Sequence, residues 1–428
     1  MSGARAGSEP AVDEAVADAA VPGALQRDLR LFYLFRLLAT SYLYVPIFML
    51  FQESRGLSFF QRLALGGVYS AVIILVEVPT GVFADRLGRR RSMMVGAAAM
   101  VASCAIAFWA RSFTWFVLAE SLAAMSMALC SGADSAYLFD LLAHHGRAQE
   151  YGHRESSASA MHLLGSAIAF AGGGLAAAID LSLPYVLTAI VAACAVVVAA
   201  MLGDDRARHR NDPRTPVVAK LQGWWSDVVG AVVHVKSNRR LAWLVGYSAV
   251  VFTLLRATIY VYQPYLDERG FGTVEIGLLF SGMYIAASGI AFRTHRLRTR
   301  YGDEPLLWGL LAVLAGSFLL LGRVSTGPWL AVLLAVQALA SGIFSPLTKP
   351  LLHEQIADSG SRAAVLSVES MARRVALGVF APLAGLYGQA QIMVLCGVVG
   401  LFGMAILAVA RLAPREAMPL LPSEPPKG

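Results

Sequence analysis

The sequence predicts an all-α protein that crosses a membrane about twelve times, in two pseudo-symmetric six-helix bundles. Hydrophobic residues make up 57% of its 428 residues and charged residues only 15%, whereas a soluble domain has about 25% charged residues. The apolar residues gather in runs of about 20, the length that a helix needs to cross a bilayer. The runs do not alternate with period two, as the strands of a membrane barrel would. The composition therefore argues against a soluble globular enzyme.

The first half of the chain holds six of these apolar runs. Before them, residues 1–26 are polar, rich in alanine and glycine, and lack the apolar core of a cleavable signal peptide, so we predict a disordered tail. The predicted spans lie near 31–51, 62–84, 92–110, 113–138, 157–178 and 183–203. Together they define an N-terminal bundle over residues 27–203.

A polar stretch, 204–239, separates the two halves. In its second part, apolar residues that include Leu221, Trp224 and Trp225 recur at helical spacing beside charged ones. This pattern is typical of an amphipathic helix on a membrane surface, where tryptophan prefers the interface. We therefore predict a cytoplasmic linker with an amphipathic helix over about 217–238.

The second half repeats the layout of the first. Its predicted spans lie near 241–264, 274–292, 305–322, 328–350, 363–387 and 391–411. They define a C-terminal bundle over residues 240–412, and two six-helix halves of this kind are the build of one large class of transporters. The proline-rich remainder, 413–428, is predicted to be disordered.

The net charge of +7 follows the predicted topology. The loops on the side of the two termini carry most of the loop arginines and lysines. The opposite loops keep little more than Arg55, Arg111, Arg269 and Arg323. An excess of positive charge marks the cytoplasmic side. We therefore predict a multi-pass protein of the plasma membrane with both termini in the cytoplasm, and no nucleic-acid partner.

A charge cluster, Gly-Val-Phe-Ala-Asp-Arg-Leu-Gly-Arg-Arg-Arg over 81–91, joins the second and third spans. Gly81 allows close approach of a neighbouring helix, and Gly88 allows a tight turn. Asp85 can accept charge-assisted hydrogen bonds from a helix N-terminus or an arginine. The arginines suit the lipid headgroup layer. Positive charge alone would serve as a membrane anchor, but it does not explain Asp85.

This loop resembles the signature loop of the major facilitator superfamily, Gly-x-x-x-Asp-Arg-x-Gly-Arg-Arg, between helices 2 and 3. The matching positions are Gly81, Asp85, Arg86, Gly88, Arg89 and Arg90. With the span layout and the linker, the resemblance covers roughly residues 27–412. It implies a two-bundle transporter fold, and it implies that the loop latches the two halves together on the cytoplasmic side.

Two departures limit what the resemblance implies. The second-half loop 293–302 has the arginines and a glycine but no aspartate, so only the first half carries a full latch. The fourth span has Glu120 where drug-exporting members often have arginine, and the fifth lacks their Gly-Pro pair. Both gaps weaken the case for drug export.

Charged residues inside the spans of the first half are candidates for function, because burying them in a membrane is costly. Arg36 and Glu77 lie ~8 Å and ~10 Å from the cytoplasmic ends of their spans at 1.5 Å rise per residue. Their matching depths predict an Arg36–Glu77 ion pair, either as a structural brace or as a gating or proton-coupling pair. Asp134, at similar depth, could take a proton, meet a cation, or neutralise Arg36 instead.

The second half has its own set of intramembrane charges. Glu369 and Arg373 are four residues apart, share a helix face and can pair. Arg374 then faces elsewhere, toward a cavity or toward a carboxylate on another helix. With Arg256, it is the best candidate for a residue that attracts an anion or switches the conformation.

Together these features predict a secondary transporter that moves a small solute by alternating access, with protons exchanged for the solute in efflux. Glu77, Asp134 or Glu369 would carry the proton. No phosphate-binding loop, metal-ligand spacing or catalytic triad occurs in the sequence, so we expect no cofactor, no metal and no enzymatic activity, and we expect a monomer. The alternatives are a proton-coupled symporter that imports a metabolite, and a non-transporting membrane scaffold or sensor.

Overall fold

The computed structural model describes residues 23–203, 217–323, 328–356 and 362–412, and within these it leaves out the side chains of Val78, Val82, Asp85, Asp227, Pro328, Leu412 and residues 217–225 and 362–363. All regular elements in the described ranges are helical. The first half contains α2 (Gly23–Leu38), α3 (Phe48–Ser54), α4 (Phe59–Leu87), α5 (Arg89–Trp109), α6 (Phe113–Cys130), α7 (Ala133–His144), α8 (Tyr151–Ala177) and α9 (Leu183–Met201). The second contains α10 (Val217–Ser237), α11 (Arg239–Asp267), α12 (Thr273–Ala291), α13 (Thr294–Tyr301), α14 (Asp303–Leu321), α15 (Pro328–Glu354), α16 (Arg362–Gly385) and α17 (Ile392–Leu412).

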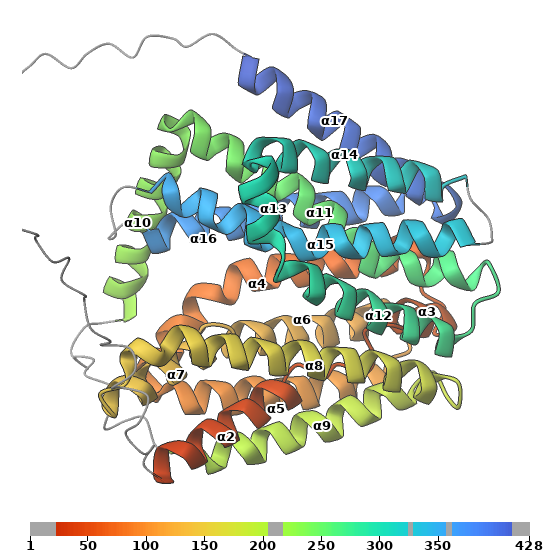
Figure 1. Cartoon of the computed structure of the whole chain (residues 1–428). Helices are drawn as coiled ribbons and strands as arrows, with labels where there is room; N and C mark the ends of the chain where they lie inside the picture. The colour runs from red at the N-terminus through yellow and green to blue at the C-terminus, as the bar shows by residue number, and fades with distance from the viewer. Residues whose placement is uncertain (1–22, 204–216, 324–327, 357–361, 413–428) are drawn as a thin grey trace, which may run out of the picture.

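The long helices run back and forth between two ends of the molecule, which lie at the left and the right of Figure 1. We call the end that holds α10, the start of α2 and the end of α17 the linker end, and the opposite end the far end. The signature loop between α4 and α5 therefore lies at the linker end, and the turn between α8 and α9 lies at the far end.

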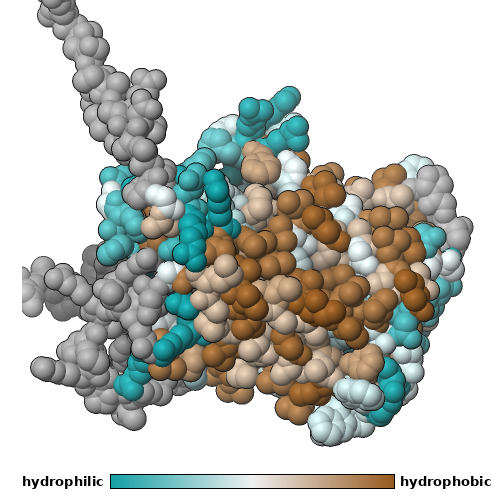
Figure 2. All heavy atoms as spheres, turned by 90° about the horizontal axis from the view of Figure 1, so that it is seen from below, coloured by the Kyte–Doolittle hydropathy of each residue, from teal (hydrophilic) through white to brown (hydrophobic). Residues whose placement is uncertain are grey.

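The outer surface carries an apolar belt between two hydrophilic ends, as Figure 2 shows for one face. Large apolar side chains such as Leu75, Ile168 and Val197 are exposed along the helices. Ten of the described helices are long and apolar enough to cross a membrane. A belt of this kind suits lipid rather than water, and the prediction of an all-α polytopic fold is confirmed.

Two predicted spans differ from these ten helices. The run 31–51 is not one helix, because α2 ends at Leu38 and α3 begins only at Phe48. The hydroxyl of Thr40 bonds back to the Arg36 carbonyl at 2.6 Å, and Pro46 has no N–H to continue a helix. The run 363–387 does form a helix, α16, but its arginines and Glu369 make it more polar than a typical span.

The linker helix α10 covers Val217–Ser237, within the stretch where a helix was predicted. Leu221, Trp224 and Trp225, which carried the prediction of an amphipathic face, lie outside the described side chains. The amphipathic character of α10 and the domain boundaries therefore stay predictions.

The two halves contact each other mainly through two helix pairs, α4 with α16 and α8 with α12, and α3 also contacts α11. At the far end, the second pair is so close that only glycine fits. A Cβ atom built on Gly174 of α8 would lie 2.8 Å from the Cα of Gly277 on α12 and 2.5 Å from the Thr273 carbonyl oxygen. Small residues permit such approach of membrane helices. The far end of the molecule is therefore closed.

Candidate functional site

The signature loop is a tight turn between two helices. Gly88 has φ 95°, ends α4 and begins α5, so only a residue free to enter the left-handed region fits well. Arg89 Nε lies 2.9 Å from a carboxylate oxygen of Asp140 on α7, and Arg90 donates to the Ala200 carbonyl of α9. These contacts tie the loop to its own half of the molecule.

Of the other signature residues, the structure describes Gly81 and Arg86 in full but leaves out the side chain of Asp85. Gly81 lines a cavity that is considered below, and Arg86 is exposed on the last turn of α4. The side chain of Asp85 lies outside the described residues. The latch that the resemblance implies for Asp85 therefore stays a prediction.

Arg36 pairs with Asp134 of α7, not with Glu77. Its guanidinium contacts the Asp134 carboxylate directly and lies 3.6 Å from a carboxylate oxygen of Glu155 on α8. The predicted Arg36–Glu77 pair is wrong, because equal depth does not specify which helices are neighbours. α2 contacts α7 and α8, whereas Glu77 on α4 faces the other half of the molecule. Of the three roles considered for Asp134, the structure supports neutralisation of Arg36.

Breaking this pair should destabilise the protein, because the side chains of Arg36 and Asp134 are only 14% and 10% exposed. We expect Arg36→Gln or Asp134→Asn to lower the free energy of unfolding by roughly 3 kcal/mol, as removal of one partner leaves a buried charge. The double variant should recover much of this loss in a thermal-unfolding measurement in detergent. A matched cycle of Arg36→Gln with Glu77→Gln should show no coupling, and a coupling there would restore the rejected pair.

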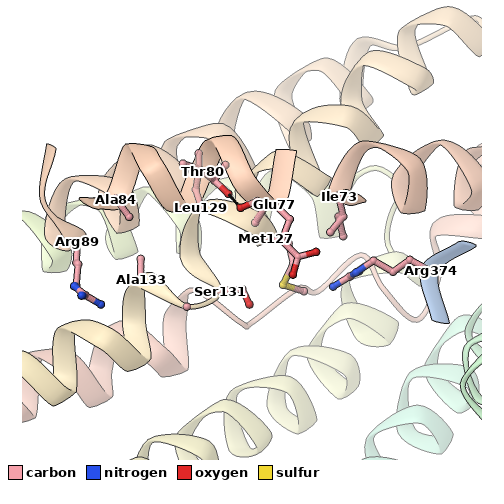
Figure 3. Close-up of a pocket in the computed structure, with 13 residues that line it drawn as sticks. Ile73, Glu77, Thr80, Ala84, Arg89, Met127, Leu129, Ser131, Ala133 and Arg374 are labelled. Carbon is pink, nitrogen blue, oxygen red and sulfur yellow. Dashed lines mark hydrogen bonds between the residues drawn. The ribbon is translucent and has the colours of Figure 1, made fainter. Parts of the chain in front are cut away.

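Glu77 of α4 and Arg374 of α16 face each other across a cavity of about 160 Å³ in the linker half of the molecule (Figure 3). Thr80, Ser131 and Gly132 also line it. Glu77 Oε2 and Arg374 Nε are buried and have no hydrogen-bond partner among the described residues. The two groups interact electrostatically without a direct ion pair. One carboxylate from the first half and one arginine from the second therefore oppose each other, incompletely satisfied.

The remaining charges on α16 are anchored within the second half. Arg373 Nη2 lies 3.0 Å from Glu369 Oε2, which confirms the predicted pair, and Ser248 of α11 donates a hydrogen bond to Glu369. The Arg256 and Arg373 guanidinium groups lie 5.6 Å and 5.1 Å from the centre of the Phe252 ring. This arrangement leaves Arg374 as the arginine of the pair that turns toward the first half.

The middle of the molecule carries a second carboxylate, Glu120 of α6, without a cationic partner in the part of the chain that the structure describes. Its one hydrogen bond comes from Gln52 Nε2 at 3.3 Å. Glu120 and Arg256 both interact electrostatically with Tyr69 of α4 and Tyr260 of α11. All four side chains keep some accessible surface although they lie deep between the halves. The centre thus contains one negative side chain and one positive side chain, and the phenol groups of Tyr69 and Tyr260 interact electrostatically with both.

Polar contacts reinforce the closed far end. Gln263 of α11 accepts a hydrogen bond from the Met49 amide at 2.9 Å and donates to the Val45 carbonyl at 2.9 Å. Arg62 of α4 is only 3% exposed; it donates to Glu53 at 2.6 Å and to Gln389 at 3.2 Å. The bonds of Gln263 and the bond from Arg62 to Gln389 connect the two halves at the far end, whereas the Arg62–Glu53 bond lies within the first half.

Sequence reasoning missed Glu120, Glu155 and Arg62 as site residues. Glu120 was noticed only as a departure from the drug-exporter pattern, although an acidic residue in the middle of an apolar run is itself a signal. Arg62 lies one turn inside α4, a position from which the sequence alone predicts an ordinary arginine at the membrane surface. Its role depends on Gln389, which is remote in the sequence.

Comparison with known proteins agrees with this architecture. The model of the Major Facilitator Superfamily matches residues 31–327, more than half of the chain. No curated protein sequence matches the chain. The solved structures that resemble it include the nucleoside transporter NupG, with 15% identity over 92% of this chain and 100% of that one, and TM-score 0.72.

Two other solved structures resemble the chain to a similar degree. A bacterial homologue of the human lysosomal transporter Spinster, inward-facing and unoccupied, has 15% identity over 91% of this chain and 98% of that one, with TM-score 0.72. A POT family transporter in complex with a thioalcohol-conjugated peptide has 14% identity over 90% and 95%, with TM-score 0.69. At such low identity these likenesses concern the fold alone.

Proposed function

Because the chain belongs to the major facilitator superfamily, we propose that it is a secondary active transporter that exports a small solute in exchange for protons. The two halves would rock against each other so that a central site opens to one side of the membrane at a time. In this reading both termini and α10 lie in the cytoplasm of a plasma-membrane protein, because the basic loops gather at the linker end.

One observation carries this proposal: α4 and α16 are in close contact toward the far end, whereas Glu77 and Arg374 of the same two helices stay unpaired at a cavity in the linker half. Near the far end, a Cβ atom on Gly67 would lie 3.1 Å from the Gly378 carbonyl oxygen. In the linker half, Glu77 and Arg374 of the same two helices flank a cavity without pairing. This combination suits a state that opens at the linker end.

Closure of the linker end would bring Glu77 and Arg374 together. A completed ion pair would stabilise the state that opens at the far end, and a proton on Glu77 would oppose that state by removing the negative charge. Proton binding would thereby bias the equilibrium between the two states, which is the requirement for coupling a proton gradient to solute movement.

The solute would bind in the centre, between Glu120 and Arg256. An arginine without a carboxylate partner attracts an anionic group, and an unpaired carboxylate attracts a cationic or hydrogen-bond-donating one. Tyr69 and Tyr260 offer hydroxyl groups and ring faces from the two halves. A non-transporting scaffold would need a centre filled with apolar side chains. These charged and hydroxyl-bearing side chains do not match that expectation.

The test is transport by the purified protein in proteoliposomes with an imposed pH gradient and a clamped membrane potential. Candidate solutes come from a growth screen of toxic compounds and metabolites in cells that overproduce the protein. An antiporter accumulates its solute in the acidic compartment, whichever way the protein is inserted. The matched variant Arg256→Gln should raise the half-saturating solute concentration about tenfold, as loss of a charged contact costs roughly 1.5 kcal/mol.

The other outcomes are equally specific. Accumulation in the alkaline compartment would replace export by proton symport. Absence of uptake for every compound that alters growth would favour the scaffold or sensor. Unchanged uptake kinetics in Arg256→Gln would move the solute site away from the centre.

A further inference from the structure

A hollow of about 760 Å³ lies at the linker end of the second half, away from the cavity between the halves. The first turns of α11 and α14 and the last turns of α15 and α17 surround it. Its apolar side chains are Trp243, Leu244, Leu307 and Leu351. Its charged side chains are Arg239, Arg240, Asp303, Glu304 and Arg411. The transport mechanism proposed above uses none of these residues.

The two carboxylates of the hollow are already neutralised. Asp303 accepts hydrogen bonds from Arg298 at 2.6 Å and 3.1 Å, and this bonding raises the pKa of the Arg298 guanidinium. Glu304 forms an ion pair with Arg411. Each carboxylate therefore has its own arginine, from α13 and α17 respectively.

Positive charge remains at the rim of the hollow. Arg240 is exposed, and among the residues that the structure describes no carboxylate lies within ion-pair distance of it, although it interacts electrostatically with Asp303 and Glu304. Arg239 donates to the Ala410 carbonyl at 3.0 Å. The lining of the hollow holds three arginines, Arg239, Arg240 and Arg411, and two carboxylates, Asp303 and Glu304, so its formal charge is positive.

The wall of the hollow has the character of a membrane interface. The indole nitrogen of Trp243 donates to the Leu407 carbonyl of α17 at 2.9 Å, which fixes the ring against the last turns of that helix. Tryptophan prefers the headgroup level of a bilayer. Leu244, Leu307 and Leu351 also line the hollow and are buried. A ligand with an anionic head and an apolar body therefore matches both parts.

We propose that this hollow binds an anionic phospholipid of the adjacent leaflet, with the headgroup phosphate at Arg240 and the start of an acyl chain against Trp243. A free phosphate ion would use only the rim and would leave the half-buried ring of Trp243 uncovered. Basic pockets between helices at the cytoplasmic side are where anionic headgroups bind.

The experiment measures lipid binding to the full-length protein by native mass spectrometry and by thermal unfolding in neutral detergent. The probes are phosphatidylglycerol, phosphatidylcholine and inorganic phosphate. Phosphatidylglycerol should bind and raise the unfolding temperature, whereas phosphatidylcholine and inorganic phosphate should do neither at the same concentration. Arg240→Gln should weaken phosphatidylglycerol binding about fivefold, the value of one arginine near an anionic surface, and Arg240→Lys should retain part of it.

The matched control is Arg296→Gln on α13, an exposed arginine at the same end that does not line the hollow. It should bind phosphatidylglycerol as the wild type does. The variants must unfold at the wild-type temperature without lipid, which separates lost binding from lost folding. Equal binding of phosphatidylcholine, an equal loss in Arg296→Gln, or displacement of the lipid by inorganic phosphate would overturn the proposal. None of these outcomes depends on whether the protein transports a solute.

Discussion

Gly174→Ala slows solute transport roughly tenfold to hundredfold while the protein still inserts into the membrane, because one added methyl group prevents the far end from closing. The new Cβ atom would lie 2.5 Å from the Thr273 carbonyl oxygen and 2.8 Å from the Gly277 Cα. Both are backbone atoms, which cannot move aside as a side chain does. Overpacking of this kind costs about 1–3 kcal/mol. The cost falls only on the state in which α8 and α12 touch, so it shifts the equilibrium toward the state that is open at the far end.

Two measurements check this expectation. Uptake rates in proteoliposomes give the loss of transport, and spin labels at the exposed positions 179 and 387 report the distance between the two halves at the far end. Gly172→Ala is the matched control, since a Cβ atom there meets only the Leu43 side chain at 3.7 Å. Gly277→Ala should reproduce the effect, and the double variant should add little because both changes disturb one contact. Wild-type transport by Gly174→Ala would show that closure of the far end is not part of the cycle.

The fold class could be predicted from the sequence because the length and composition of each apolar run indicate by themselves that the run lies in a membrane. A helix of about 20 apolar residues is a local property, and so is the excess of arginine in the loops at one end. The break in the first predicted span was less visible. Pro46 is near the end of the run, and the backbone bond of Thr40 competes with the helix only once the surroundings hold it in place.

The pairing of the charges could not be predicted, because depth is a one-dimensional quantity. Arg36, Glu77 and Asp134 lie at similar depths, and only the packing of α2 beside α7 selects the pair. Glu369 with Arg373 was predictable because both residues are on one helix, four positions apart. The contact of Gly174 with Gly277 joins residues about a hundred positions apart. The sequence around a glycine in a membrane helix does not indicate which residue of another helix it contacts.

Glu77→Gln should abolish accumulation driven by a pH gradient while leaving exchange of labelled for unlabelled solute intact. Glutamine keeps the shape of the side chain but can neither bind the coupling proton nor complete an ion pair with Arg374. For one proton per solute, each pH unit supports about tenfold accumulation. In Glu77→Gln this ratio should fall to one at every imposed gradient. Exchange without a gradient needs only the solute site and the rocking of the two halves, so it should continue.

Arg374→Gln distinguishes coupling at Glu77 from a purely structural role. It should retain some pH-driven accumulation, because Glu77 can still take a proton, but with slower transport since the closed linker end loses its ion pair. Glu275→Gln, at an exposed carboxylate in the first turn of α12, is the matched control and should behave as the wild type. If Glu77→Gln still accumulated solute about tenfold per pH unit, the proton would be carried elsewhere, and Glu120 would become the first residue to replace. If Glu77→Gln lost exchange as well, its role would lie in the conformational change itself, because a site that only couples protons is not needed when no gradient is used.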